Sequence, residues 1–331
     1  MANPELRCSV QTREVGIDPI GTAPTTDAYL LVEVPLPWPP AILDHRLLGP
    51  VGAELASAGI GATVLGVVPD HDEVGRHRII GYRRPPGPFQ RFRRTEQVVP
   101  TAELAAAAVA LLGAADDTAG TEGTDGSEGT DGSDDSDAGR TTDLLICTHG
   151  RRDRCCGSLG TNLFTAIGAR HVRAGVRSWR VSHTGGHRFA PTAVFLPDGT
   201  LWSWLDGDLV DTIVHRRGEP DAILDHYRGS SAIGEAPVQV AEREAFRREG
   251  WVWLDGHRTG SVVSRDGDRS EVRIDVSRPD GSSGVYTATV ERAGTVPQAA
   301  CGEPPGGAGN GKSDSIWVLT RFDAVETTPP G

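Results

Sequence analysis

The sequence lacks the apolar segments that carry a chain into or across a membrane. No hydrophobic run approaches the roughly 18–20 residues that a membrane helix needs. The opening MANPELRCSV has neither the basic block nor the apolar block of a secretory signal. We therefore expect a cytoplasmic protein with no membrane partner, and its 331 residues allow about two domains.

Basic patches are also missing. The formal net charge is −12, and the segment between Asp116 and Asp137 holds nine acidic residues and no basic one. Outside that segment the chain is nearly neutral, and no stripe of arginines could follow a phosphate backbone. We therefore expect no nucleic-acid partner. The composition does not predict the oligomeric state.

Cysteine is scarce, and its count is odd. An odd count in a large chain without an export signal argues against a disulfide framework and favours metal or redox chemistry. No glycine-rich phosphate loop, Ser-His-Asp order or pair of catalytic carboxylates emerges, so we do not expect an enzyme that uses one of these arrangements. The five cysteines are Cys8, Cys147, Cys155, Cys156 and Cys301.

One segment divides the chain. Residues 116–142 are rich in Gly, Ser, Thr and Asp, which predicts a disordered acidic linker. Before it, residues 1–115 form a predicted N-terminal α/β part. After it, residues 143–235 contain the sequence motifs, and residues 236–331 form a predicted small α+β appendage.

Strands and helices alternate on both sides of the linker, which predicts an α/β fold. Hydrophobic patterning predicts strands at 28–34, 62–68, 78–82, 143–147 and 176–182 and a hairpin over 191–205. It predicts helices at 51–58, 101–113, 157–172, 209–216, 221–227 and 238–249. In the tail it predicts further strands at 260–264, 270–276, 284–292 and 315–321.

Two motifs contain soft metal ligands. The string CTHGRRDRCCG begins at Cys147, where a predicted strand ends, and the string HTGGH begins at His183, where the next strand ends. Sites in open α/β sheets form beyond the carboxyl ends of the strands, so Cys147, Cys156 and His183 should lie on one edge. With His187 they predict a metal centre made by two thiolates and two imidazoles.

The residues around these ligands suit a tight, polar loop. Gly185 and Gly186 make a helix improbable and allow the backbone to approach an inorganic sulfide closely. His149 could donate a hydrogen bond to a ligand or act as one. Cys8 and Cys301 stand alone in the sequence, and we expect them to bind nothing.

The two motifs, together with the opening RCSVQTREVGIDPIGTAPTTDAYLLVEVPLPWPP, resemble the sucrase/ferredoxin-like family over roughly residues 6–250. The resemblance implies a thioredoxin-like fold and a [2Fe–2S] cluster held by Cys147, Cys156, His183 and His187. It also implies electron transfer with an unidentified redox partner protein. The run from Pro191 is similar to the thioredoxin hairpin, in which a cis-proline lies near the site.

Ligation by two histidines predicts an unusual redox potential. Two thiolates cancel the charge of an oxidised cluster core, whereas four thiolates leave it negative. The potential should therefore lie above the value of about −400 mV for plant-type ferredoxins, toward the Rieske range of roughly −150 to +300 mV. It should fall as the pH rises, because a reduced site holds protons on its imidazoles more tightly.

Two alternatives remain open from the sequence. A Cys₂His₂ set could hold structural zinc in a binding module. The adjacent residues Cys155 and Cys156 could instead carry out thiol–disulfide exchange, although the usual redox motif separates its cysteines by two residues.

Overall fold

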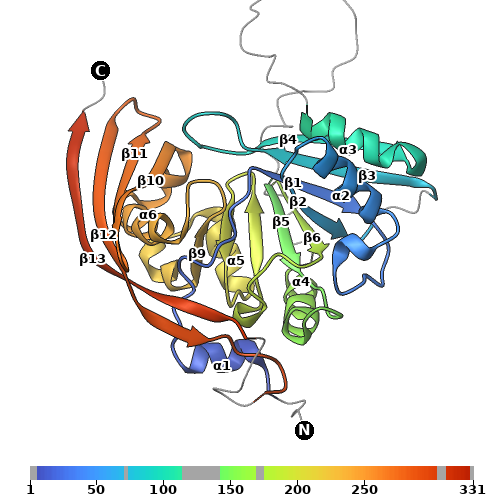
Figure 1. Ribbon diagram of the computed structural model, residues 1–331, viewed down its shortest axis with the longest axis horizontal. Helices are drawn as coiled ribbons and strands as arrows, with labels where there is room; N and C mark the ends of the chain where they lie inside the picture. The colour runs from blue at the N-terminus through green and yellow to red at the C-terminus, as the bar shows by residue number, and fades with distance from the viewer. Residues whose placement is uncertain (1–5, 71–73, 114–141, 169–174, 304–310, 329–331) are drawn as a thin grey trace, which may run out of the picture.

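The computed structural model describes residues 6–70, 74–113, 142–168, 175–303 and 311–328. The predicted acidic linker lies outside these residues, apart from residue 142. The end of the helix predicted over 157–172 also lies outside them. The fold is mixed α/β, with one large mixed sheet and a separate four-stranded antiparallel sheet (Figure 1).

The large sheet has nine strands in the order β4-β3-β1-β2-β6-β5-β7-β8-β9. Among the strand pairs that the described residues form in this sheet, only β1–β2 and β5–β6 are parallel. Strands from both sides of the predicted linker share the sheet and meet where β2 pairs with β6 through Val67 and Val181. The strands are β1 (Ala28–Glu33), β2 (Thr63–Val67), β3 (Arg76–Arg83), β4 (Arg93–Pro100), β5 (Thr142–Cys147), β6 (Val176–Val181), β7 (Ala193–Leu196), β8 (Thr200–Trp202) and β9 (Tyr227–Ser230).

Helices pack on this sheet through narrow apolar faces. In α2 (Leu48–Ser57) the buried residues are Leu48, Val51 and Leu55, a spacing that places them on one side of a helix. The next helix, α3 (Leu104–Gly113), packs against α2 and β3. In the part of the chain after residue 142, α4 (Thr161–Ile167) follows β5, and α5 (Gly207–His215) follows β8. None of the described helices is long and apolar enough to cross a membrane.

Two predicted helices differ in form from the structure, and one short α-helix was not predicted. The helix predicted from 157 begins as a wider turn at Cys156–Gly160, and α4 ends before Gly168, whose φ is +48°. The helix predicted over 221–227 is present as a 3-10 helix, Pro220–His226, and Tyr227 instead begins β9 because it pairs with β8. A short helix at the start of the chain, α1 (Cys8–Glu14), was not predicted.

The C-terminal part is a helix packed on a small sheet. The helix α6 (Ala236–Glu249) contacts all four strands, which run in the order β10-β11-β12-β13. Figure 1 shows the long β12–β13 hairpin reaching down to α1. There the backbone N–H of Gly302 donates to the carbonyl oxygen of Leu6 at 2.9 Å. The strands are β10 (His257–Asp266), β11 (Arg269–Ser277), β12 (Ser283–Pro297) and β13 (Ser313–Thr328).

Candidate metal centre

The two motifs begin at the same edge of the large sheet. Strand β5 ends at Cys147, which is in register with Val181 at the end of the parallel strand β6. The backbone N–H of Thr148 continues the pairing by donating to Val181 at 3.0 Å. Because both strands end here, His183 begins its loop next to Cys147, as the β-α-β pattern predicts.

Glycines allow the cysteine loop, residues 148–156, to fold back onto this strand end. An added methyl group at Gly160 would overlap the carbonyl oxygen of Cys147, and one at Gly157 would overlap the Cα atom of Gly150. Only glycine permits backbone segments to approach so closely. The resulting tight return brings Cys156 next to Cys147.

The first cysteine group consists of Cys147, Cys156 and His183. Their ligand atoms all lie within 4.8 Å of one another, and both thiols are buried. A hydrogen bond from Cys156 and the neighbouring His183 hold the pKa of Cys147 well below its usual value. The Nδ1 atom of His183 is buried and has no hydrogen-bond partner among the described residues. Two buried sulfurs together with an imidazole whose Nδ1 atom has no described partner are a donor set that a soft metal satisfies.

His187, the fourth predicted ligand, lies next to this group but faces a different neighbour. Its ring centroid is 6.4 Å from that of His183. Its Nδ1 atom is 3.0 Å from Oδ2 of Asp153 and 3.4 Å from Sγ of Cys8. The structure therefore brings together three of the four predicted ligands and positions His187 between them and a second set of sulfurs.

The second cysteine group consists of Cys8, Asp153, Cys155 and Cys301. Their ligand atoms also lie within 4.8 Å of one another, in a largely buried group that could hold a metal ion. We expected Cys8 and Cys301 to bind nothing because they are isolated in the sequence. The fold removes that isolation, since it brings them to Cys155 across 147 and 146 residues of sequence.

The histidine loop, residues 183–187, has the tight geometry that its glycines predict. Gly185 and Gly186 have φ angles of +85° and +74°, in the left-handed region that favours glycine. Gly186 lies directly against the guanidinium group of Arg228, which donates to the carbonyl oxygens of Gly185 at 3.2 Å and Thr22 at 2.6 Å. Burial lowers the pKa of Arg228 to about 9. Sequence reasoning missed this arginine because nothing near the motif points to it.

Two other predicted neighbours have clear places. His149 is buried, and its ring meets that of Trp38 edge-on at 5.6 Å. Burial lowers the pKa of His149. The peptide bond between Ala190 and Pro191 is cis, as predicted, and Ala190 belongs to the same apolar cluster as four of the cysteines.

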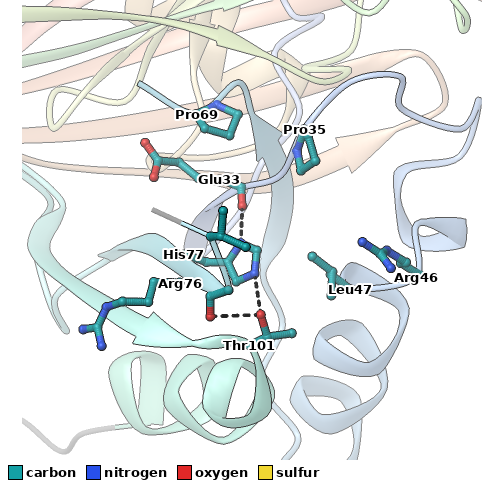
Figure 2. A pocket seen from close by; sticks show the side chains of 10 residues that line it. Glu33, Pro35, Arg46, Leu47, Pro69, Arg76, His77 and Thr101 are labelled. Carbon is teal, nitrogen blue, oxygen red and sulfur yellow. Dashed lines mark hydrogen bonds between the residues drawn. The ribbon is translucent and has the colours of Figure 1, made fainter. Parts of the chain in front are cut away.

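A pocket of about 610 Å³ lies elsewhere, near the end of β1 and the start of β3. Figure 2 shows the His77 ring in this pocket, held between the carbonyl oxygen of Glu33 and the hydroxyl of Thr101, each at 2.9 Å. Both ring nitrogens are thus hydrogen-bonded within the fold, and none of the described residues that line the pocket is a cysteine. The soft ligands for redox or metal chemistry lie in the two cysteine groups.

Comparisons with known proteins give one match. No curated protein and no solved structure matches the chain. A family model described as sucrase/ferredoxin-like matches residues 19–229, which is well over half of the chain and includes the cysteine loop and the histidine loop. The chain therefore belongs to the sucrase/ferredoxin-like family.

Proposed function

We propose that this protein transfers electrons through a [2Fe–2S] cluster held by Cys147, Cys156, His183 and His187. The observation that carries the proposal is the convergence of two thiols and one imidazole within 4.8 Å at the ends of two parallel strands. His187 is the fourth ligand because it follows His183 in the same tight loop. A rotation of its side chain would turn it from Asp153 toward the first cysteine group.

The donor set fits such a cluster chemically. When bound, a [2Fe–2S] cluster supplies a one-electron redox centre whose potential depends on its ligands. Two thiolates and two neutral imidazoles leave an oxidised cluster uncharged. The potential therefore lies above that of four-cysteine ferredoxins and falls as the pH rises.

The exposure of the ligands supports an electron carrier that is open on its histidine side. Cys147 and Cys156 are 0% and 1% exposed, so the sulfur side is shielded from water. The side chain of His187 is 20% exposed. We infer that an unidentified redox partner protein docks over the histidine loop, where the path for an electron is shortest.

We also propose that residues from β5 to α5 form a thioredoxin-like unit. Strands β6, β5, β7 and β8 are neighbours in that order, with β5 parallel to β6 and antiparallel to β7. The cis peptide at Pro191 comes just before β7. These features support the relationship, and the single 3-10 turn His187–Phe189 in place of a longer helix between β6 and β7 is a departure from it.

The most direct chemical test compares wild-type protein with the variant Cys147→Ser, both purified without oxygen. The wild type should be reddish-brown and contain about two irons and two acid-labile sulfides per chain, and the variant should lose both. A colourless wild type with zinc bound to the first cysteine group would contradict the proposal and favour a zinc-binding module. Loss of redox activity in Cys155→Ser with the iron intact would favour thiol–disulfide exchange.

A further inference from the structure

We propose that the second cysteine group is a separate metal site, in which Cys8, Cys155, Cys301 and Asp153 hold one zinc ion. The site is additional to the proposed cluster and does not depend on it. The zinc ion would have a structural role, with all four ligands supplied by the protein. Structural zinc sites usually have four protein ligands.

The three sulfurs already form the face of a tetrahedron. The Sγ atoms are 3.5 Å apart for Cys8 and Cys155, 3.2 Å for Cys155 and Cys301, and 3.4 Å for Cys301 and Cys8. Zinc–sulfur bonds of about 2.3 Å in a regular tetrahedron place sulfurs about 3.8 Å apart. An expansion of a few tenths of an ångström would seat the ion.

Asp153 is oriented to supply the fourth ligand. Its Oδ1 atom accepts hydrogen bonds from the backbone N–H groups of Cys155 at 2.7 Å and Cys156 at 3.3 Å, which fixes the carboxylate. Its Oδ2 atom is left 4.0 Å from the Sγ atom of Cys8 and 3.0 Å from Nδ1 of His187. With Oδ1 fixed in this way, Oδ2 is the oxygen that would bind the zinc ion.

Three thiols in mutual contact fit a metal better than a disulfide. A disulfide between any two of them would leave the third unpaired, and its formation would need an oxidant to accept two electrons. A single zinc ion uses all three thiolates and the carboxylate without any redox step.

The ligands come from three distant parts of the chain, which indicates what the ion would do. Cys8 begins α1, Cys155 lies in the loop after β5, and Cys301 follows β12. Gln11 of α1 also donates to the carbonyl oxygen of Glu303 at 2.9 Å. The ion would therefore fasten the N-terminal helix and the C-terminal hairpin over the cysteine loop. Cys8 and Cys301 lie outside residues 19–229, so the family match includes only Asp153 and Cys155 of this site.

The test measures zinc and iron in the same samples of full-length wild type, Cys301→Ser and Cys147→Ser, each dialysed against buffer with a trace of zinc. The wild type should hold about one zinc per chain. Cys301→Ser should lose zinc at least about tenfold and keep its iron, whereas Cys147→Ser should keep its zinc and lose its iron. If the wild type contains zinc but no iron, and Cys301→Ser loses that zinc, the result would support this site and contradict the proposed cluster.

Four results would overturn the zinc site, three of them from metal analysis or peptide mapping. The first is a wild type without zinc, and the second is equal zinc in wild type and Cys301→Ser. The third is a peptide linking Cys155 to Cys301 by a disulfide in protein alkylated without reductant, because that result identifies a redox pair. Cobalt exchange into Cys147→Ser is the second readout. Cobalt bound to this variant should give intense thiolate-to-cobalt absorption. The double variant Cys147→Ser/Cys301→Ser should lack that absorption, and equal absorption in the single and double variants would also overturn the site.

Discussion

The two cysteine groups lie side by side but are assembled differently. The first group takes its ligands from one β-α-β segment, in which two parallel strands end at the same edge of the sheet. The second group joins the N-terminal helix, the cysteine loop and a segment beyond β12. A site built within one supersecondary unit can therefore be predicted from a sequence. A site built by long-range packing is visible only in the fold.

Cys155 and Cys156 show how narrow the boundary between the groups is. They are adjacent in the sequence, yet Cys155 contacts Cys8 and Cys301 while Cys156 belongs with Cys147. Both have helical backbone geometry or begin a helical turn, where successive side chains point about 100° apart. The two neighbours are therefore directed into different groups.

The largest expected effect comes from replacing Cys155 and Cys156 by serine, one at a time. Cys156→Ser should lose iron at least about tenfold and keep zinc, because it removes a thiolate from the first group only. Cys155→Ser should do the opposite. Metal analysis of both variants provides the measurement, and each serves as the control for the other. Loss of the same metal from both variants would contradict two separate sites and indicate that the two cysteine groups bind one metal centre.

The next effect tests how the C-terminal hairpin is attached. The carboxylate of Asp314 in β13 pairs with the buried guanidinium of Arg188, beside His187. Asp314→Ala leaves that charge without its partner and should lower the free energy of unfolding by about 3–5 kcal/mol. It should also weaken zinc retention more than iron retention, because Cys301 is held by the same hairpin.

The matched control is Asp275→Ala on the same small sheet. Asp275 pairs with Arg273, and both side chains are more than 40% exposed. Its loss should change the free energy of unfolding by less than about 1 kcal/mol. Urea unfolding of both variants checks the difference. Similar losses in the two variants would show that the Arg188–Asp314 pair does not anchor the hairpin.

A smaller effect separates backbone strain from steric overlap in the histidine loop. Gly185→Ala places an alanine at positive φ with only ordinary contacts, which should cost about 1–2 kcal/mol. Gly186→Ala adds a collision with Arg228 and should cost about 1–3 kcal/mol more. Unfolding midpoints and iron content of the two variants measure the difference. Equal costs would mean that Arg228 moves freely and does not position the loop.

The smallest effect concerns the redox potential. The midpoint potential of the wild type should fall with rising pH by up to about 59 mV per unit where one proton accompanies one electron. Cys301→Ser should show the same slope, because the second group takes no part in the electron transfer. A midpoint that stays constant between about pH 6 and 9 would argue against histidine ligation.

Much of the fold could be predicted because its strands are short apolar runs. The strands at 143–147 and 176–182 were found to within a residue, since the burial of β5 makes it almost continuously hydrophobic. Strand β4 was missed because Arg93–Pro100 is mostly exposed and reads as charged. The short helix α1 was missed because it has no side-chain cap at its start.

The candidate site could be predicted only where its parts are local. Cys147, Cys156 and His183 converge through a single β-α-β unit, whose geometry follows from the sequence pattern. Cys8 and Cys301 meet Cys155 because α1 and the β12–β13 hairpin pack together, and no sequence pattern encodes that contact. Arg228 likewise reaches the histidine loop from β9, far along the chain.

Pulsed EPR of the dithionite-reduced protein tests the central claim most directly, because it detects both the cluster and the atoms that bind it. We predict the low average g value of a Rieske-like centre together with strong coupling to two imidazole nitrogens, one from His183 and one from His187. The nitrogen coupling should weaken in His183→Cys. A silent spectrum, or a cluster signal without nitrogen coupling, would contradict the proposed ligation.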